Sequence, residues 1–370
     1  METLKEENQA VYLFFKISEA ISKGRTKVAT TANLVMVHTY FEIGRMIVEE
    51  EQGGEKRASY GKKVLKFLSV KLVEEFGKGF SIQNLRNMRK FYLVFSETKI
   101  QKRQMPSVVF QSFKDELDRC LYDDDFKINL FNLSWSHYLI LMRIERKDER
   151  QFYEIEAVNQ NWSEAQLKRQ YNSSLFERLV LSRDKEEVLK LSSEGNVIAK
   201  PQDIIKNPLT LDFLGLEEKF EYNETDIELA VISRLQDFLL ELGKGFLFEA
   251  RQKRFTFDEK HFYVDLVFYN RLLQCYVLID LKSEELIHQD LGQMQMYVNY
   301  YDRYEKLEHE KPTIGILLCK KKSDALVELT LPKEANIYAS EYSLYLPEKQ
   351  LLQQKMVEWV NDFENENIVR

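Results

Sequence analysis

The sequence predicts a multidomain protein with a mainly α-helical N-terminal domain and an α/β C-terminal domain. Apolar residues at helical spacing dominate the first half of the chain, whereas apolar, β-branched and aromatic runs typical of buried strands occur in the second half. Between them lies a charged segment interrupted by Gly195 and Pro201, which favours a linker. We therefore expect a helical domain at residues 1–185, a linker at 186–211 and an α/β domain at 212–370.

The N-terminal domain is expected to begin with an amphipathic helix at residues 33–52, because its apolar residues recur at helical spacing. This helix should end before Gly53, and a second helix should run from Ser59 to Phe76. The rest of the domain is expected to hold helices at 133–144, 148–159 and 162–178, and an irregular segment at 99–125.

A helix-turn-helix-like segment is predicted around the end of the second helix. The turn Gly77–Gly79 leads to Ser81, which can cap a further helix over residues 82–95. One side of that helix is apolar, and the other side can reach base edges and phosphates of DNA. The polar side displays Gln83, Asn84, Arg86, Asn87, Arg89 and Lys90. Two antiparallel helices of a bundle would give the same pattern.

Charge is distributed unevenly along the chain. The whole sequence carries a formal net charge of −7, yet residues 56–103 hold 13 Lys/Arg against 3 Asp/Glu, a balance of +10. After Leu191 the balance is 21 against 32, or −11. A basic segment can bind a polyanion such as DNA, and carboxylates gathered elsewhere can bind metal ions. The alternative is a lysine-rich helix face in solvent.

The α/β domain is expected to open with a helix at residues 226–243, with Thr225 or Asp226 as its N-cap. A strand should follow at 245–255. Its basic residues could contact phosphate groups, although charges on an edge strand would explain them equally well. These residues are Arg251, Lys253 and Arg254.

A predicted β-hairpin with one carboxylate in each strand is the central feature of this domain. Two apolar runs at residues 262–269 and 274–281 are interrupted by Asp265 and Asp280. An ionised carboxylate inside a sheet is costly unless a cation or hydrogen-bond donors satisfy it. Lys282 lies two residues after Asp280, so both side chains should project from the same face. Two acids and a lysine are therefore expected to converge.

Such a combination suits phosphodiester hydrolysis. Asp265 and Asp280 can bind a hard divalent cation through oxygen, with the backbone carbonyl of Leu281 as a third ligand. Lys282 can orient or deprotonate the attacking water. A surface hairpin with satisfied charges is the alternative.

Downstream of the hairpin, a helix at residues 289–301 places Gln293 and Tyr297 one turn apart on one face. Strands are expected at 313–319 and 335–339, and a terminal amphipathic helix at 351–363. The predicted order is therefore helix, three strands, helix, strand.

These motifs resemble those of the PD-(D/E)XK nuclease superfamily, whose signature is Asp on one strand and Asp/Glu-x-Lys on the next. Here Val264 stands at the position of the proline. The segments FEARQKR, YVDLVFYNRLLQCYVLIDLK and GQMQMYVNYYD are similar to those of YhcG-like bacterial proteins of that superfamily, and the similarity covers nearly the whole chain. The resemblance implies a restriction-endonuclease-like α/β domain that uses Mg²⁺ or Mn²⁺ to hydrolyse DNA.

The resemblance also implies residue roles. Asp265, Asp280 and Leu281 would bind the metal, and Lys282 would position the water and stabilise charge. A glutamate on the first helix would assist the metal; the candidate is Glu228, and Glu241 and Glu224 are alternatives.

The Gln-x-x-x-Tyr pair belongs to a subset of the superfamily. By this resemblance Gln293 would help to place Lys282 or a phosphate, and Tyr297 would support the scissile region.

Composition limits the other classes of protein. The three cysteines lack CxxC spacing, which argues against a zinc site or a disulfide framework. The chain has 44% hydrophobic residues but no run of membrane-spanning length. Because the segment METLKEENQA is polar and acidic, no secretory signal is expected, and we expect a cytoplasmic protein without a membrane partner.

We therefore expect a metal-dependent DNA endonuclease. The resemblance implies a role in DNA recombination, repair or defence against foreign DNA. It also implies a homo-oligomer, a dimer, because many relatives of the superfamily act as dimers that cut both strands. One alternative is a non-catalytic DNA-binding or assembly protein that retains the nuclease fold, against which the intact Asp265, Asp280 and Lys282 argue. Another is a nuclease that acts on RNA or branched DNA.

Overall fold

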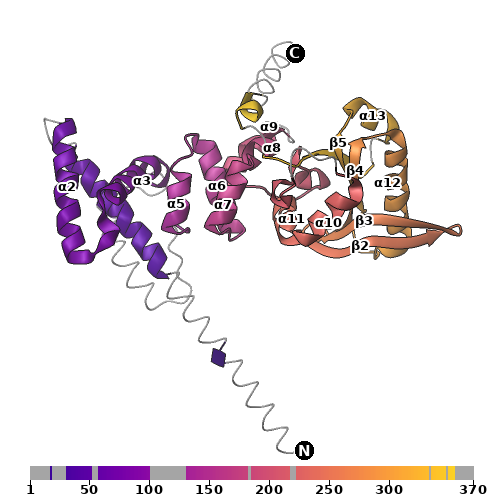
Figure 1. The fold of residues 1–370 in the computed structure, drawn as a ribbon, viewed down its shortest axis with the longest axis horizontal. Helices are drawn as coiled ribbons and strands as arrows, with labels where there is room; N and C mark the ends of the chain where they lie inside the picture. Colours follow the sequence, from indigo (N-terminus) through magenta and orange to yellow (C-terminus); the bar gives the residue numbers. More distant parts are fainter. Residues whose placement is uncertain are drawn as a thin grey trace, which may run out of the picture. The chain divides into compact units, whose positions relative to one another are not determined.

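The computed structural model describes residues 17–18, 31–51, 57–100, 131–181, 185–216, 222–332, 335–346 and 349–354. The chain forms two compact units, residues 1–150 and 151–370 (Figure 1). Most of the expected irregular segment at 99–125 and of the expected terminal helix at 351–363 lies outside the described residues. Within the described ranges, no helix is both long and apolar enough to cross a membrane.

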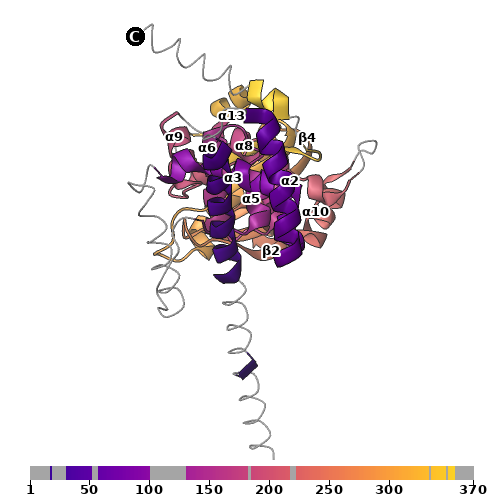
Figure 2. The same ribbon diagram turned by 90° about the vertical axis from the view of Figure 1, so that its left-hand side faces the viewer.

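The N-terminal unit is helical, as predicted. A helix over residues 31–51 is followed by α2 (Arg57–Phe76), the 3₁₀ turn η1 (Lys78–Phe80), α3 (Ile82–Ile100) and α5 (Trp135–Leu141). The helices α2 and α3 pack against each other (Figure 2). The backbone N–H of Asn84 donates to the Ser81 hydroxyl at 3.2 Å, so the predicted cap forms.

Apolar packing holds α3 in this unit. Leu85 and Met88 are fully buried against Ile47 and Leu65. Phe91, also fully buried, lies in an aromatic cluster with other rings of the unit. The apolar side of α3, the second helix of the predicted helix-turn-helix, therefore faces the core, and its polar side lies outside the core.

The segment from 151 to 216 differs in two ways from the sequence-based expectation. The expected helix at 162–178 is divided into α7 (Glu164–Asn172) and α8 (Leu175–Leu181), because Ser174 has a left-handed backbone with φ 55°. The expected linker at 186–211 is structured within the second unit. It contains most of α9 (Lys185–Glu194), the 3₁₀ turn η2 (Pro201–Ile204) and strand β1 (Leu209–Thr210).

The glycine and proline residues of that segment explain the difference. Gly195, with φ 75°, ends α9, and Pro201 starts η2 at a position where its missing N–H costs nothing. Arg178 also donates from Nη1 to the Pro208 carbonyl at 3.0 Å. These residues mark turns between ordered elements, which a sequence pattern does not distinguish from a flexible linker.

The second unit is built on a six-stranded mixed sheet in the order β1-β6-β5-β4-β3-β2. Strands β2, β3 and β4 form an antiparallel meander, and β4, β5, β6 and β1 pair in parallel. The strands are β2 (Phe246–Phe257), β3 (Lys260–Asn270), β4 (Cys275–Glu285), β5 (Ile314–Lys321) and β6 (Ile337–Ser343).

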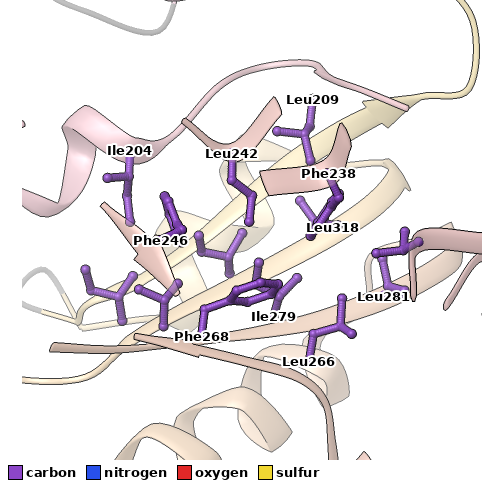
Figure 3. Close-up of a cluster of buried hydrophobic side chains, with 14 of the residues drawn as sticks. Ile204, Leu209, Phe238, Leu242, Phe246, Leu266, Phe268, Ile279, Leu281 and Leu318 are labelled. Carbon is purple, nitrogen blue, oxygen red and sulfur yellow. The ribbon is translucent and has the colours of Figure 1, made fainter. Parts of the chain in front are cut away.

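Helices cover both faces of this sheet, as predicted for an α/β domain. On one face, α10 (Glu224–Ser233) and α11 (Leu235–Leu242) pack on Phe268, Ile279 and Leu281 (Figure 3). The opposite face carries α12 (His288–Tyr300), which packs on Leu278 among other residues. Successive residues of β4 thus alternate between two cores, which fixes the face on which Asp280 and Lys282 lie.

The expected helix at 226–243 begins earlier and is broken. Its N-cap is Asn223, whose side chain accepts from the Asp226 N–H at 2.9 Å while the Asp226 carboxylate accepts from the Asn223 N–H at 3.3 Å. Thr225 and Asp226 are therefore inside the helix. At the break, the Ser233 hydroxyl donates to the Ala230 carbonyl at 2.7 Å, a contact that competes with helical bonding and bends helices.

Candidate active site

The two predicted carboxylates meet where β3 and β4 separate. The paired register of these strands runs from Asn270↔Cys275 to Leu266↔Ile279 and stops there. Beyond that point, the Leu281 N–H donates to Asp265 Oδ2 at 2.8 Å, and the Asp265 N–H donates to Asp280 Oδ1 at 3.5 Å. Carboxylate oxygens thus take the place of strand carbonyls, and the two acids are brought together as predicted.

Lys282 completes the cluster. Its Nζ lies 3.1 Å from Asp280 Oδ2. Leu278, two residues before Asp280 on the same strand, packs in the core beneath α12, whereas Ile279 and Leu281 pack in the opposite core. The predicted alternation along β4 is therefore confirmed, and it places Asp280 and Lys282 on the α12 face.

Burial and like charge set the protonation of the acids. Burial raises the pKa of Asp280, and repulsion from Asp265 adds to this, giving about 7 despite the opposing attraction of Lys282. Burial likewise raises the pKa of Asp265, although the Leu281 N–H, the charge of Lys282 and Gln252 oppose it. Placing two buried carboxylates together is unfavourable without a further cation.

Lys282 is protonated in this setting. Burial lowers its pKa, but attraction and hydrogen bonding to Asp280 outweigh burial, so the net shift is upward. A protonated ammonium cannot take a proton from water. The metal-free geometry therefore favours water positioning and charge stabilisation by Lys282 over the role of a general base.

The three candidate glutamates of α10 and α11 lie in different surroundings. Glu228 is buried and ion-paired with Arg251. Glu224 lies at the site, with Oε2 3.9 Å from Lys282 Nζ and Oε1 accepting from the Ser283 N–H at 3.3 Å. Glu241 is fully buried against Arg178 and belongs to a different cluster.

Gln252 is a site residue that the sequence-based argument missed. Its Nε2 donates to Glu228 Oε2 at 2.9 Å and to Asp265 Oδ1 at 2.8 Å, so it joins the helix glutamate to the strand aspartate. Its backbone is left-handed, with φ 46°, which is unusual for a residue within a strand. Only the strand register shows this: Arg251 pairs with Leu266 and Lys253 with Val264, leaving Gln252 opposite Asp265. No local sequence signal would have found it.

Gln293 and Tyr297 contact each other on α12, where the Gln293 amide donates to the Tyr297 hydroxyl. Tyr297 is buried, which raises its pKa, and the charges of Asp280 and Lys282 are close enough to act on it in opposite directions. The pair therefore lies beside the acidic cluster, on the same face of the sheet.

Two of the three basic residues predicted to contact phosphate in β2 lie near acids. Arg251 pairs with Glu228, and Lys253 Nζ lies 3.7 Å from Glu249 Oε1 at the surface. Arg251 thus has a structural partner, and its contact with nucleic acid stays a prediction.

The polar side of α3 is also partly occupied. Asn84 donates to the Gly79 carbonyl at 2.5 Å and accepts from the Trp135 indole at 3.1 Å, which supports the fold of the unit. Arg89 pairs with Glu51 at 2.5 Å. Three of the predicted contact residues are exposed to solvent: Gln83, Arg86 and Lys90.

The donor set fits a hard divalent cation. In the ranges that the structure describes, no group of three or more His, Cys, Asp or Glu side chains gathers in the way a protein-only metal site requires. Mg²⁺, however, needs only one or two carboxylates because it retains water and substrate oxygens. The buried pair Asp265 and Asp280 provides them, and a cation would relieve their repulsion.

A cavity of about 580 Å³ lies at the carboxyl ends of the parallel strands, next to Ser283, the residue that follows Lys282. Ser283 and Glu284 line one side, Lys320 lies at the end of β5, and Tyr342 belongs to β6. Ligands of open α/β sheets bind at this edge.

The titration of Asp280 predicts a pH-dependent stability in EDTA. The pKa of Asp280 is about 7 in the folded chain, above the ordinary value near ~3.9, so the folded state binds more protons between these values. This contribution to stability is present below about pH 4 and is lost as the pH rises through about 7. The free energy of unfolding of Asp280→Asn should therefore fall less between pH 5 and pH 8 than that of the wild type, measured by urea denaturation.

Added Mg²⁺ provides the complementary measurement, since it needs ionised carboxylates. Its stabilisation of the wild type should be larger at pH 8 than at pH 5. Equal stabilisation at both pH values, or parallel pH profiles for the wild type and Asp280→Asn, would contradict this assignment.

Comparison with known proteins identifies relatives of this chain. Residues 202–357 match the model of the YhcG PDDEXK nuclease domain, and residues 16–178 match that of the DUF1016 N-terminal domain. A curated relative from Escherichia coli (strain K12), named "Putative nuclease YhcG", is 38% identical over 364 residues, covering 96% of both chains.

Two solved structures align with part of this chain. A repair endonuclease from Pyrococcus abyssi aligns with 35% of this chain and 50% of its own, at 18% identity and a TM-score of 0.25. The EndoMS–dsDNA complex aligns with 36% of this chain and 49% of its own, at 16% identity and a TM-score of 0.25. The chain thus spans about half the length of these structures.

Proposed function

We propose the function of this chain from one premise: it belongs to the YhcG family of PDDEXK nucleases. We propose that it is a metal-dependent DNA endonuclease. The observation that carries the proposal is the convergence of Asp265, Asp280 and Lys282 at the point where β3 and β4 separate. Asp265 and Asp280 would hold Mg²⁺ or Mn²⁺, with the Leu281 carbonyl as a further ligand and Glu228 in support. The bound metal would act as a Lewis acid on the scissile phosphate.

The chain's own residues would prepare the reaction. Lys282, held by Asp280, presents a positive charge that can orient a water and stabilise charge on the phosphate. Gln252 fixes the Asp265 carboxylate from the side of Glu228. Gln293 and Tyr297, hydrogen-bonded to each other, would support the phosphate region from α12. Each of these groups is placed by a strand or a helix of the core, which favours a rigid site.

The nucleic acid substrate is tested by direct competition. DNA and RNA of the same sequence, single-stranded, double-stranded and as a four-way junction, would be incubated with the wild type in Mg²⁺, Mn²⁺ or EDTA. We expect DNA to be cut in the presence of metal and all substrates to stay intact in EDTA. Selective cutting of RNA would replace the proposed substrate, and cutting in EDTA would exclude the proposed chemistry.

We further propose that the exposed side of α3 contacts DNA phosphates. Arg86 and Lys90 are both exposed on a segment of strongly positive charge. Replacing both with Ala should weaken DNA binding and reduce the slope of log K against log salt by about 1.8, because each phosphate contact contributes about 0.9. The measurement is fluorescence anisotropy at several salt concentrations in EDTA.

The matched control is Lys71→Ala, which removes an exposed lysine from α2 that pairs with Glu74 at 3.1 Å. It should change the slope little. If the double variant binds with the wild-type slope, α2 and α3 act as a bundle hairpin and the DNA contact lies elsewhere.

The biological setting follows from the same proposal. A DNA endonuclease of this kind would serve DNA recombination, repair or defence against foreign DNA, in the cytoplasm. A homodimer would allow both strands to be cut, and analytical ultracentrifugation with and without DNA would measure the oligomeric state.

A further inference from the structure

A second cavity, of about 340 Å³, lies between the β2–β3 hairpin and α12. Rings from both elements form its walls: Phe255 and Phe257 from β2, and Tyr300 and Tyr304 from α12 and the π-helical turn η4 (Tyr301–Glu305) that follows it. We call it the aromatic cavity. Its volume falls in the range of small-molecule sites. The long hairpin and α12 are seen together in Figure 1.

The rings of the aromatic cavity differ in their exposure to solvent. Phe255 is buried and stacked on Tyr300, with ring centroids 4.1 Å apart and an interplanar angle of 22°. By contrast, Phe257 is 52% exposed and Tyr304 is 62% exposed. Both exposed rings line the same cavity, and apolar surface that is grouped in this way marks binding sites, whereas single exposed rings need no explanation. The outer rings thus offer flat, accessible faces for stacking.

Polar groups converge on the same cavity. The Oε1 of Gln295 is buried and has no hydrogen-bond partner among the described residues, while its Nε2 contacts Asn299 Oδ1 at 3.4 Å. A buried amide oxygen without a donor costs free energy, so a rotation of the Gln295 side chain that brings this oxygen to a ligand N–H group in the cavity would be favourable. Arg303 adds an exposed positive charge at the rim.

The aromatic cavity is linked to the candidate active site by contacts between side chains. Phe255, in its wall, makes an edge-to-face contact with Tyr297 at 5.5 Å between centroids. Tyr297 in turn binds Gln293 beside the acidic cluster. Tyr297 therefore contacts both the wall of the aromatic cavity and the Gln293 side chain of the candidate active site.

We infer that the aromatic cavity binds an unpaired nucleobase of the nucleic acid substrate. A base combines a flat π-surface, N–H donors and an attached phosphate, and each of these has a counterpart in the rings, in Gln295 Oε1 and in Arg303. Every natural base carries an N–H donor, so the recognition is of an unpaired base rather than of a sequence. This inference rests on the proposed nucleic acid substrate and adds a preference for DNA with an unpaired nucleotide.

The test measures binding in EDTA, so that it does not depend on cleavage. The probes are a short DNA duplex with one unpaired adenine and the same duplex with an abasic residue at that position. The wild type should bind the adenine duplex about 5- to 100-fold more tightly, as expected for one stacked base. Equal binding of the two duplexes by the wild type would overturn the inference.

Two variants locate the effect. Gly292 lines the aromatic cavity, and a Cβ added there meets no atom within 4 Å, so Gly292→Phe should fill the cavity. Tyr304→Ala removes an exposed ring, which the fold does not need. Both should bring the ratio of the two affinities close to one.

The control is Tyr263→Ala, because Tyr263 is exposed on β3 but pairs with Arg254 and so alternates to the face of the hairpin opposite Phe255. It should keep the wild-type ratio. A ratio that persists in Gly292→Phe and Tyr304→Ala, or that is lost in Tyr263→Ala alone, would place base binding outside this cavity.

The failure of this inference is distinguishable from the failure of the proposed function. A preference for the unpaired adenine without cleavage in any metal would support base binding by the aromatic cavity and contradict the proposed nuclease activity. Metal-dependent cleavage with equal binding of the two duplexes would do the reverse. Self-association of the wild type that is abolished in Tyr304→Ala, together with equal binding of the duplexes, would show that a second copy occupies the cavity and would overturn the inference.

Discussion

Replacing Asp280 with Asn is expected to reduce the rate of metal-dependent DNA cleavage by at least about 10³-fold, because the loss of metal binding removes several kcal/mol of transition-state stabilisation. The substitution keeps the size of the side chain, which is 4% exposed, and keeps an oxygen near Lys282. DNA binding in EDTA should change little, since the contacts assigned to α3 lie in the other unit. The measurement is the single-turnover cleavage rate at saturating enzyme.

Asp258→Asn is the matched control for this experiment. Asp258 is an exposed acid at the tip of the β2–β3 hairpin, in the turn that precedes the strand of Asp265. Its variant should cleave at the wild-type rate. Cleavage by Asp280→Asn within a few-fold of the wild type would show that the active site is assigned wrongly.

Replacing Glu241 with Gln is expected to destabilise the second unit by about 3–5 kcal/mol, because it leaves buried positive charge without its partner. Glu241 and Arg178 are both fully buried, with Oε1 and Nη1 2.5 Å apart. Arg169 Nη1 lies 3.3 Å from Oε2, and Lys206 donates to the Glu241 backbone carbonyl. Glu241 lies on α11, so its carboxylate connects this helix to Arg169 of α7 and Arg178 of α8.

The titration of Glu241 agrees with this role. Burial raises the pKa of Glu241, but the charges of Arg178, Lys206 and Arg169 outweigh burial and lower it to about 2. The folded pKa is depressed, so the stabilisation is present above about pH 4 and is lost as the pH falls through about 2.

Thermal and urea unfolding would measure the loss in Glu241→Gln, with a decrease in Tm on the order of 10 °C. Glu285→Gln is the matched control, since Glu285 pairs with Lys321 at 3.2 Å but both side chains are more than half exposed. Such a pair contributes about 0–1 kcal/mol. Equal stability of Glu241→Gln and the wild type would show that the buried cluster does not hold the unit together.

Sequence patterns predicted the site more completely than the surrounding architecture. The convergence of Asp265, Asp280 and Lys282 could be predicted because charge inside apolar strands is costly and because side chains alternate along β4. The pairing of Gln293 with Tyr297 followed from helical spacing. These signals are local, so a single sequence reveals them.

The features that were missed depend on contacts between distant residues. Gln252 is placed by the register of β2 against β3, which brings it opposite Asp265. The engagement of Arg89 depends on Glu51, 38 residues earlier in the chain. The expected linker proved to contain β1, because a two-residue strand is defined only by its pairing with β6. Patterns of residue type do not encode such pairings.

The most direct test of the central claim is cleavage of supercoiled plasmid DNA by the wild type and by Lys282→Ala, in Mg²⁺, Mn²⁺ or EDTA. In the described part of the chain, the ion pair of Asp280 is with Lys282. Replacing Lys282 with Ala removes this positive charge and leaves Asp265 and Asp280 in place. We expect nicked or linear plasmid with the wild type and metal, and supercoiled plasmid with the variant or with EDTA. Equal cleavage by the wild type and Lys282→Ala, or no cleavage by the wild type in either metal with DNA binding retained, would contradict the account.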